Sequence, residues 1–444
     1  MKDLSTYSRI IRLGIPILIG QVGMIIVGFA DTKMVGLYAT DALASASFVN
    51  NVFNVPILGC LGFTFGLTPL IGSLFSQKRI TDCGGMVKAG LVVNLFFALL
   101  ATLLMSGVYF ALPYLGQPEE LLPLIRPYYI IAALGVIPVT VFNVFAQWAY
   151  AINRTRLPMW IILFSNVLNI FGNWLLIYGN WGLPELGLTG AGISTLVARV
   201  VCPLIIITIF FLKHDYREYA EGFRGVALRG VNLRRVFTTS WPVSLQMICE
   251  TCAFSLTAVM AGWISAFSLA ALQIILIVGT LGFCIYYSMA AAVSVLVANA
   301  NGLGNVDEMR RVSFCGYRII LMFATCSSTL FALWGSALMH QFSDDPQVLA
   351  IASTLIVPLV LYQYADATQI CFANALRGTG QVMPMLWIAV ISYLIIGLPS
   401  TYFIAFTLDM STYGIVLSWS VSLVVAAVLY YRSFIRATKA VAAK

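Results

Sequence analysis

Residues 16–36 read PILIGQVGMIIVGFADTKMVG, and residues 242–262 read PVSLQMICETCAFSLTAVMAG. Each stretch is long and apolar enough to cross a lipid bilayer as one helix, which takes about 20 residues. Proline, methionine and glycine recur at matching places, at positions 16, 34 and 36 and again at 242, 260 and 262. The sequence therefore predicts a membrane protein built from two copies of one helical unit.

The composition of the whole chain agrees with a membrane location. Of its 444 residues, 60% are hydrophobic and 9% are charged, and the mean hydropathy is +0.93. Soluble domains carry roughly 25% charged residues. We expect an all-α integral membrane fold with twelve transmembrane helices. The twelve apolar runs cover residues 13–37, 45–74, 89–113, 125–150, 158–181, 188–212, 237–262, 267–299, 313–338, 348–375, 384–406 and 411–432.

The net charge of +8 follows membrane topology rather than a nucleic-acid partner. Basic residues dominate the N-terminal tail, every second loop, the segment 213–235 and the C-terminal tail, whereas the intervening loops hold mostly acids. Loops rich in Lys and Arg stay on the cytoplasmic side of a membrane. Both termini are therefore expected in the cytoplasm, which requires an even number of spans.

The internal repeat predicts how the spans are grouped. The two copies match at a constant offset of 226 residues from Pro16 to Met159, without a gap, and the offset falls to 222 near the end. Six spans is an even number, so the repeats are parallel and related by an axis along the membrane normal. We expect an N-terminal six-helix lobe at 1–212, a cytoplasmic linker at 213–235 and a C-terminal six-helix lobe at 236–444. A central cleft is expected between the lobes.

Three of the seventeen acidic residues, Asp31, Glu250 and Asp366, lie deep inside apolar spans. A carboxylate at that depth costs about 2.5–3.5 kcal/mol on insertion scales. The equivalent positions in the other copy hold uncharged residues. The scaffold is therefore repeated while each lobe carries its own chemistry, and the acids are candidates for binding a cation or a proton.

In the first lobe, four oxygen-bearing side chains are expected at a similar depth: Asp31 in span one, Asn169 and Asn173 in span five, and Thr195 in span six. The two asparagines are four residues apart, so they share one helix face. Oxygen ligands of this kind bind hard cations, and Asp31 can instead bind a proton. Alternatively, the asparagines only form hydrogen bonds between helices.

In the second lobe, Tyr362 and Asp366 are likewise four residues apart in span ten, and Glu250 lies at a similar depth in span seven. Desolvation and like-charge repulsion disfavour two bare carboxylates in one poorly solvated cavity. Such a pair would hold a proton, a metal cation or a cationic substrate. The alternative is an ion pair with a base, but spans seven and ten, as delimited above, contain no Lys or Arg.

Arg199 lies in the middle of span six, one turn from Thr195. It can be the charge partner of Asp31, taking the place of a cation, or it can contact carbonyl groups at a helix end.

Signals for an enzyme are weak in this chain. The nine cysteines are scattered, mostly within spans, and the two histidines, His214 and His340, fall in loops. The sequence contains no metal-ligand cluster, phosphate-binding loop or nucleophile motif. We therefore predict neither an enzyme nor a cofactor, apart from Na⁺ or H⁺ as a coupling ion.

Five sequence features together make this chain similar to a known protein family. They are GFADTKMVG at 28–36, NRTRLPM at 153–159, Glu250, YQYAD at 362–366 and ALRGTG at 375–380. With them the chain resembles the multidrug and toxic compound extrusion (MATE) family, specifically its norfloxacin-exporter (NorM-type) branch. The resemblance implies two six-helix bundles and drug efflux driven by Na⁺ or H⁺. It also implies a second-lobe cation site at Glu250, Tyr362 and Asp366, and a first-lobe site matching Asp31, Asn169, Asn173 and Thr195.

We therefore expect a cation-coupled antiporter in the bacterial inner membrane that exports amphipathic, cationic drugs or toxic compounds from the cytoplasm. Its partners would be these small molecules and membrane lipid, and we expect a monomer. A flippase for lipid-linked oligosaccharide or peptidoglycan precursors on the related fold is the alternative, although it would need several basic residues in its cleft. A membrane receptor or scaffold without transport is a third alternative. The sequence does not choose between Na⁺ and H⁺.

Overall fold

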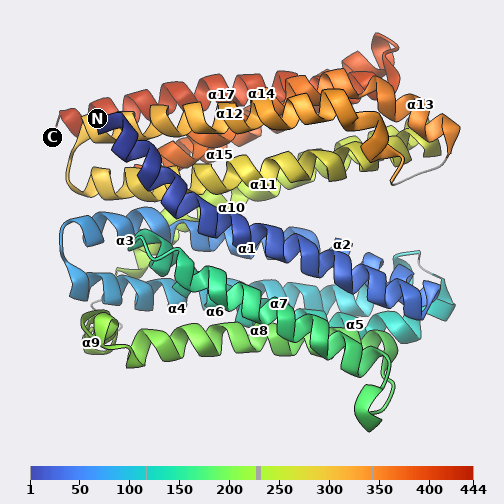
Figure 1. Ribbon diagram of the computed structural model, residues 1–444, viewed down its shortest axis with the longest axis horizontal. Coiled ribbons are helices and arrows are strands. Elements are labelled where there is room, and N and C mark those ends of the chain that lie inside the picture. The colour runs from blue at the N-terminus through green and yellow to red at the C-terminus, as the bar shows by residue number, and fades with distance from the viewer. Residues whose placement is uncertain (1, 117, 227–231, 342–344, 444) are drawn as a thin grey trace. The chain divides into compact units, whose positions relative to one another are not determined.

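The computed structural model describes residues 2–116, 118–226, 232–341 and 345–443, and the elements within these ranges are helices (Figure 1). Eleven helices there are long and apolar enough to cross a membrane. A twelfth span is a pair of helices, Pro346–Thr354 and Ile356–Gly378, bent by 47° at their junction. Each predicted apolar run overlaps one of these twelve, so the predicted all-α membrane fold is confirmed.

The chain packs as two compact units, which we call the N-terminal unit (Ile19–Ser244) and the C-terminal unit (Leu245–Lys444 with Met1–Leu18). The N-terminal unit contains α2 (Thr40–Phe65), α3 (Leu67–Ser76), α4 (Ile80–Ala111), η1 (Leu112–Tyr114), η2 (Glu119–Leu121), α5 (Leu122–Leu134), α6 (Val136–Ala151), α7 (Arg156–Ile177), η3 (Asn180–Gly182), α8 (Gly187–Leu212), η4 (His214–Tyr216) and α9 (Arg217–Gly225). The C-terminal unit contains α11 (Ala266–Gly302), α12 (Val306–Met339), α13 (Pro346–Thr354), α14 (Ile356–Gly378), α15 (Met383–Ala389), η6 (Val390–Gly397), α16 (Leu398–Tyr402), η7 (Phe403–Thr407) and α17 (Ser411–Ala442).

Two helices, α1 (Lys2–Tyr38) and α10 (Leu233–Ile264), are divided between the units. The divisions follow Leu18 in α1 and Ser244 in α10, which correspond to each other at the offset of 226 residues. The lobe and linker boundaries expected from the repeat remain predictions, and residues 227–231 of the linker lie outside the described residues.

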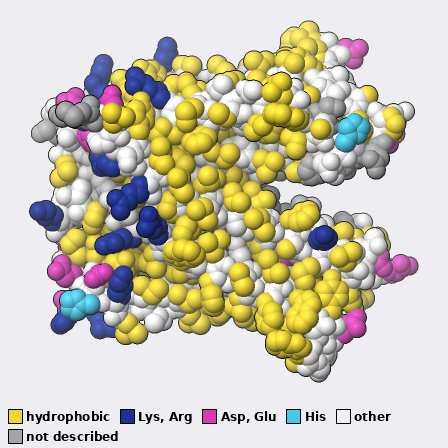
Figure 2. All heavy atoms as spheres, in the orientation of Figure 1, with side chains coloured by type: hydrophobic (Ala, Val, Ile, Leu, Met, Phe, Trp, Pro, Cys, Tyr) yellow, Lys and Arg dark blue, Asp and Glu magenta, His cyan; other side chains and the backbone are white. Residues whose placement is uncertain are grey.

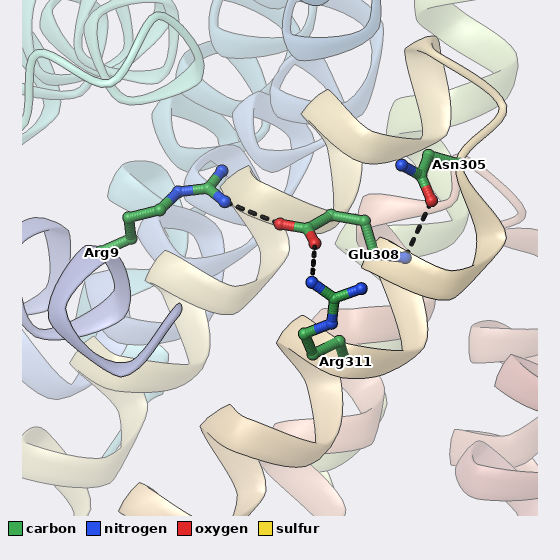
Figure 3. A network of polar contacts seen from close by, with 4 residues as sticks. All are labelled: Arg9, Asn305, Glu308 and Arg311. Carbon is green, nitrogen blue, oxygen red and sulfur yellow. Dashed lines mark hydrogen bonds and ion pairs between the residues drawn. The ribbon is translucent and has the colours of Figure 1, made fainter. Parts of the chain in front are cut away.

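The first turns of α1 are held in the C-terminal unit by charge (Figure 3). Arg9 Nη1 lies 2.6 Å from Glu308 Oε1, and Arg311 Nη1 lies 3.2 Å from Glu308 Oε2. The backbone N–H of Glu308 donates to Asn305 Oδ1 at 3.0 Å, which fixes the start of α12. One glutamate therefore ties the beginning of α1 to the beginning of α12.

The first turns of α10 pack in the N-terminal unit in a different way. Ser244 Oγ donates a 2.7 Å hydrogen bond to the carbonyl oxygen of Gly59 in α2. At Gly66, a Cβ would lie 2.7 Å from Ser240 Cα, so only glycine allows this close approach of two backbones. Small residues serve the same purpose at many helix–helix contacts in membranes.

The surface of each unit is mostly apolar along the length of the helices, and Lys and Arg side chains gather toward one end (Figure 2). In the N-terminal unit this end includes α9, a short helix that packs on the start of α4. Glycines make the contact close, because a Cβ at Gly84 or Gly222 would overlap the carbonyl oxygen of Tyr219 or Thr81. Lys88 Nζ also donates to the Val226 carbonyl at 2.7 Å.

Candidate functional site

Two acids of the C-terminal unit, Glu250 on α10 and Asp366 on α14, form what we call the carboxylate pair. Asp366 is 3% exposed and Glu250 is half-buried. The two carboxylates repel each other electrostatically, and each also interacts electrostatically with the hydroxyl of Tyr362. The structure thus brings together the three residues that the sequence proposed for the second lobe.

Asp366 receives a hydrogen bond from a residue that sequence analysis missed. The hydroxyl of Tyr286, on α11, donates to Asp366 Oδ2 at 2.8 Å. Tyr286 is fully buried. A hydroxyl that donates to an ionised oxygen makes one of the stronger kinds of hydrogen bond, so Tyr286 stabilises the charged form of the acid.

Glu250 is held at both carboxylate oxygens. Gln246, one turn earlier in α10, donates from Nε2 to Glu250 Oε2 at 2.9 Å. The hydroxyl of Tyr393 donates to Oε1 at 3.2 Å and accepts a 3.0 Å bond from Nε2 of Gln369, on α14. Tyr393 lies in η6, a π-helical segment. Such segments are rare and frequently occur at functional sites.

Arg377 is the buried base that the sequence analysis placed outside span ten. Because α14 continues to Gly378, Arg377 lies in its last turn and is only 8% exposed. It attracts Glu250 and is hydrogen-bonded to the Tyr287 hydroxyl, and its Nη1 donates to Asn374 Oδ1 at 3.2 Å. Span ten as delimited from the sequence ended at residue 375, so the search for a base within it did not reach Arg377.

The carboxylate pair and Arg377 do not balance in charge. When both carboxylates are ionised, they and the one guanidinium carry a net charge of −1. An unbalanced charge in a membrane interior is costly. One monovalent cation or one proton would remove the imbalance.

Aromatic side chains stand next to Glu250. The ring of Phe254 lies 6.4 Å from that of Tyr362, 6.5 Å from that of Tyr393 and 5.2 Å from that of Trp419. Three of these rings, those of Phe254, Tyr393 and Trp419, line a cavity with about 20 Å³ of room for a water-sized occupant, together with polar groups such as that of Thr257. That volume fits about one water molecule, whereas pockets for drug-sized ligands have about 300–1,000 Å³.

The N-terminal unit brings together the other four predicted side chains, which we call the Asp31 site. Asn173 Nδ2 donates to Asp31 Oδ1 and lies 3.4 Å from Asn169 Oδ1. Asn169 Nδ2 donates to Thr195 Oγ1 at 3.0 Å. The asparagines therefore form hydrogen bonds that link α7 to α1 and α8. Such bonds between helices were the alternative to cation binding in the sequence analysis. Asn173 is fully buried, and its Oδ1 has no hydrogen-bond partner among the described residues.

Arg199 belongs to the surroundings of the same site. It lies on α8 four residues after Thr195 and attracts Asp31 electrostatically. Its side chain lies against Gly135, between α5 and α6, because a Cβ there would be 2.8 Å from Arg199 Nη1. Both contacts that the sequence offered for Arg199, an acid and a helix end, are thus near it.

Comparison with known proteins agrees with this arrangement. The MatE family model matches residues 16–175 and 242–403, so its two matches begin 226 residues apart, at the offset of the internal repeat. The chain is 27% identical over 440 residues to "Probable multidrug resistance protein NorM" of Agrobacterium fabrum, covering 98% of this chain and 95% of the relative. It is 28% identical over 407 residues to the protein of the same name from Photorhabdus laumondii, covering 90% and 88%.

The fold is also that of a solved structure. "Outward-facing conformation of a multidrug resistance MATE family transporter of the MOP superfamily" superimposes with a TM-score of 0.88, covers 99% of this chain and 97% of its own, and is 18% identical. Together with the two matches of the family model, this shows that the chain is a multi-pass membrane protein of the MatE family.

Proposed function

We propose that this chain is a cation-coupled antiporter that exports amphipathic, cationic drugs or toxic compounds from the cytoplasm across a bacterial inner membrane. The family and the names of the relatives support multidrug efflux. The observation that carries the coupling is the carboxylate pair, which sets two acids against one base, Arg377, so that ionisation of both acids leaves one negative charge.

We propose that the coupling ion neutralises the excess negative charge of the carboxylate pair. Entry of one Na⁺ or H⁺ down its gradient would remove one negative charge from the carboxylate pair. The electrostatic interaction of Tyr362 with both acids supports its assignment to the same site. A bound ion can shift a conformational equilibrium only through different affinities for the two states. We therefore propose that the ion-bound pair favours the conformation that releases substrate outward.

A cationic substrate fits the same charge balance. The group formed by the pair and Arg377 needs one positive charge to become neutral. The coupling ion or a cationic substrate can supply that charge, but not both at once. Such competition is what the exchange of an ion for a substrate requires. The aromatic-lined cavity beside Glu250 has room for about a water molecule rather than for a drug.

The test is dye export from proteoliposomes in which a Na⁺ gradient and a pH gradient are imposed separately. The wild-type protein should respond to one of them, and Asp366→Asn should abolish that response because it leaves Glu250 balanced by Arg377. Asp409→Asn is the matched control, since Asp409 is exposed in a loop and its substitution should leave export unchanged. Ion-dependent export at the wild-type rate by Asp366→Asn would refute the proposed coupling site.

Flippase activity is not favoured by any observation on these side chains. A lipid-linked pyrophosphate would need uncompensated basic groups, but the bases Arg199 and Arg377 each attract an acid. Both termini are proposed to face the cytoplasm from the distribution of Lys and Arg. Protease accessibility of an epitope at each end, in sealed inside-out vesicles, would test that orientation.

A further inference from the structure

Arg199 is a half-buried arginine near the middle of a membrane-spanning helix, α8. A cation at such depth is expensive unless it is paired. The fold makes a recess for it: Gly135 leaves the room that a Cβ would fill, 2.8 Å from Arg199 Nη1 and 3.1 Å from Cδ. The arginine is therefore built into the packing of the N-terminal unit rather than directed to the membrane surface.

The recess lies at the junction of two helices. Helix α5 ends at Leu134 and α6 begins at Val136, so Gly135 is the one residue between them. The carbonyl oxygen of Ala132 lies 3.2 Å from the same Cβ position and accepts a 3.1 Å hydrogen bond from the Gly135 backbone N–H. A guanidinium in this place therefore takes its opposite charge from Asp31.

Asp31 and Tyr128 are the titratable groups that interact with Arg199. Tyr128 extends from α5 over α8, where its Cδ2 would lie 3.1 Å from a Cβ at Gly192. A tyrosine is neutral near pH 7, so an ionised Asp31 and Arg199 together carry no net charge. The carboxylate pair of the C-terminal unit differs, because it sets two acids against one arginine, Arg377.

The Asp31 site is also linked to Arg199 by structure. Thr195, one turn before Arg199 on the same face of α8, accepts a hydrogen bond from Asn169. Asn169 in turn lies next to Asn173, which donates to Asp31. The polar side chains of the Asp31 site thus run from Asp31 to the turn of α8 that precedes Arg199.

We propose that Arg199 is the resident cation of the Asp31 site: it supplies the positive charge that the coupling ion supplies at the carboxylate pair. While Arg199 is present, the N-terminal unit takes up no coupling ion, and ion exchange is confined to the C-terminal unit. This inference rests on the proposed cation-coupled function and assigns different roles to its two candidate sites. Arg199 is a positioning and specificity-determining residue, since it acts on ions through Asp31.

Removing the arginine should create an ion site. Arg199→Gln leaves Asp31 uncompensated, close to the buried Oδ1 of Asn173, which has no hydrogen-bond partner among the described residues. The purified variant should bind one more cation per protein than the wild type, measured as bound radioactive Na⁺ with proton uptake followed in parallel. Arg126→Gln is the matched control, because Arg126 is exposed on the adjacent α5 and should leave the cation number unchanged.

A charge-neutral double variant tests the same inference through export. Asp31→Asn alone leaves Arg199 unbalanced, and we expect dye export to fall by roughly tenfold or more, because an uncompensated buried charge is strongly destabilising. Adding Arg199→Gln should restore export and the wild-type number of bound cations. If Arg199→Gln alone cannot be purified, the double variant still decides the question.

An unchanged cation number in Arg199→Gln, or a double variant as inactive as Asp31→Asn alone, would overturn the proposal. Its failure can be told apart from failure of the proposed function. The cation count needs no transport, and Asp366→Asn, which tests the coupling site, leaves Asp31 and Arg199 as they are.

Discussion

Tyr286→Phe removes one hydroxyl from the carboxylate pair and should change its affinity for the coupling ion. The lost bond is the 2.8 Å donation to Asp366 Oδ2, from a side chain that is fully buried. A hydrogen bond to a charged group contributes about 1.5–3 kcal/mol, and one to a neutral group about 1 kcal/mol. The ion-free pair therefore loses more stability than the ion-bound pair, by about 0.5–2 kcal/mol.

That difference corresponds to a roughly 2- to 30-fold increase in affinity for the coupling ion, because about 1.4 kcal/mol is a factor of ten. The assay is the melting temperature of the purified protein as a function of ion concentration, since a ligand that binds the folded state stabilises it. Half-maximal stabilisation should require correspondingly less ion in Tyr286→Phe than in the wild type.

Tyr129→Phe is the matched control. Tyr129 is also buried and donates at 2.8 Å, but to the Met105 carbonyl in the N-terminal unit. This variant should lose about 1 kcal/mol of stability without a change in the ion concentration at half-effect. Equal half-effect concentrations for Tyr286→Phe and the wild type would refute the assigned role of Tyr286.

Two further substitutions test the packing. Glu308→Gln should weaken the anchor of α1 at Arg9 by about 0.2–1 kcal/mol per ion pair, and the loss of melting temperature should disappear in about 1 M salt, where charges are screened. Gly222→Ala should lower the unfolding free energy by about 1–3 kcal/mol, because its Cβ would overlap the backbone carbonyl of Thr81. Gly225→Ala is the control, because a Cβ at Gly225, at the end of the same helix, meets open space and should not be destabilising. Both variants can be compared by thermal unfolding in detergent. Equal losses of stability in the two variants would contradict the assigned contact of α9 with α4.

Most of the fold could be predicted from the sequence, because each membrane span corresponds to a long run of apolar residues. The match of Pro16 with Pro242 also predicted the two copies, and the family model begins its two matches at these residues. The packing of the first turns of α1 was not predictable in the same way. It depends on the contact of Arg9 with Glu308, two charges 299 positions apart, which no local pattern connects.

The candidate site was predictable where charge stands out against an apolar background. Glu250 and Asp366 were found for that reason, and Gln246 could have been found as well, since it precedes Glu250 by one helical turn. Tyr286 and Tyr393 could not, because a tyrosine that donates to a buried acid looks the same in sequence as one at the membrane interface.

Arg377 shows a different limit of the sequence. An apolar run indicates where lipid surrounds a helix, but not where the helix ends. Helix α14 continues through Gly378, and the guanidinium is buried against Tyr287 and near Glu250 instead of reaching a loop. Arg377 could therefore be included among the charges around the carboxylate pair only when the end of α14 was known.

The number of cations that the purified protein binds tests the central claim most directly. Na⁺ binding and proton uptake, measured together, should give one coupling cation for each wild-type protein. Asp366→Asn should bind none, because Glu250 and Arg377 then balance each other. Retention of a bound coupling cation by Asp366→Asn would contradict the assignment of ion exchange to the carboxylate pair.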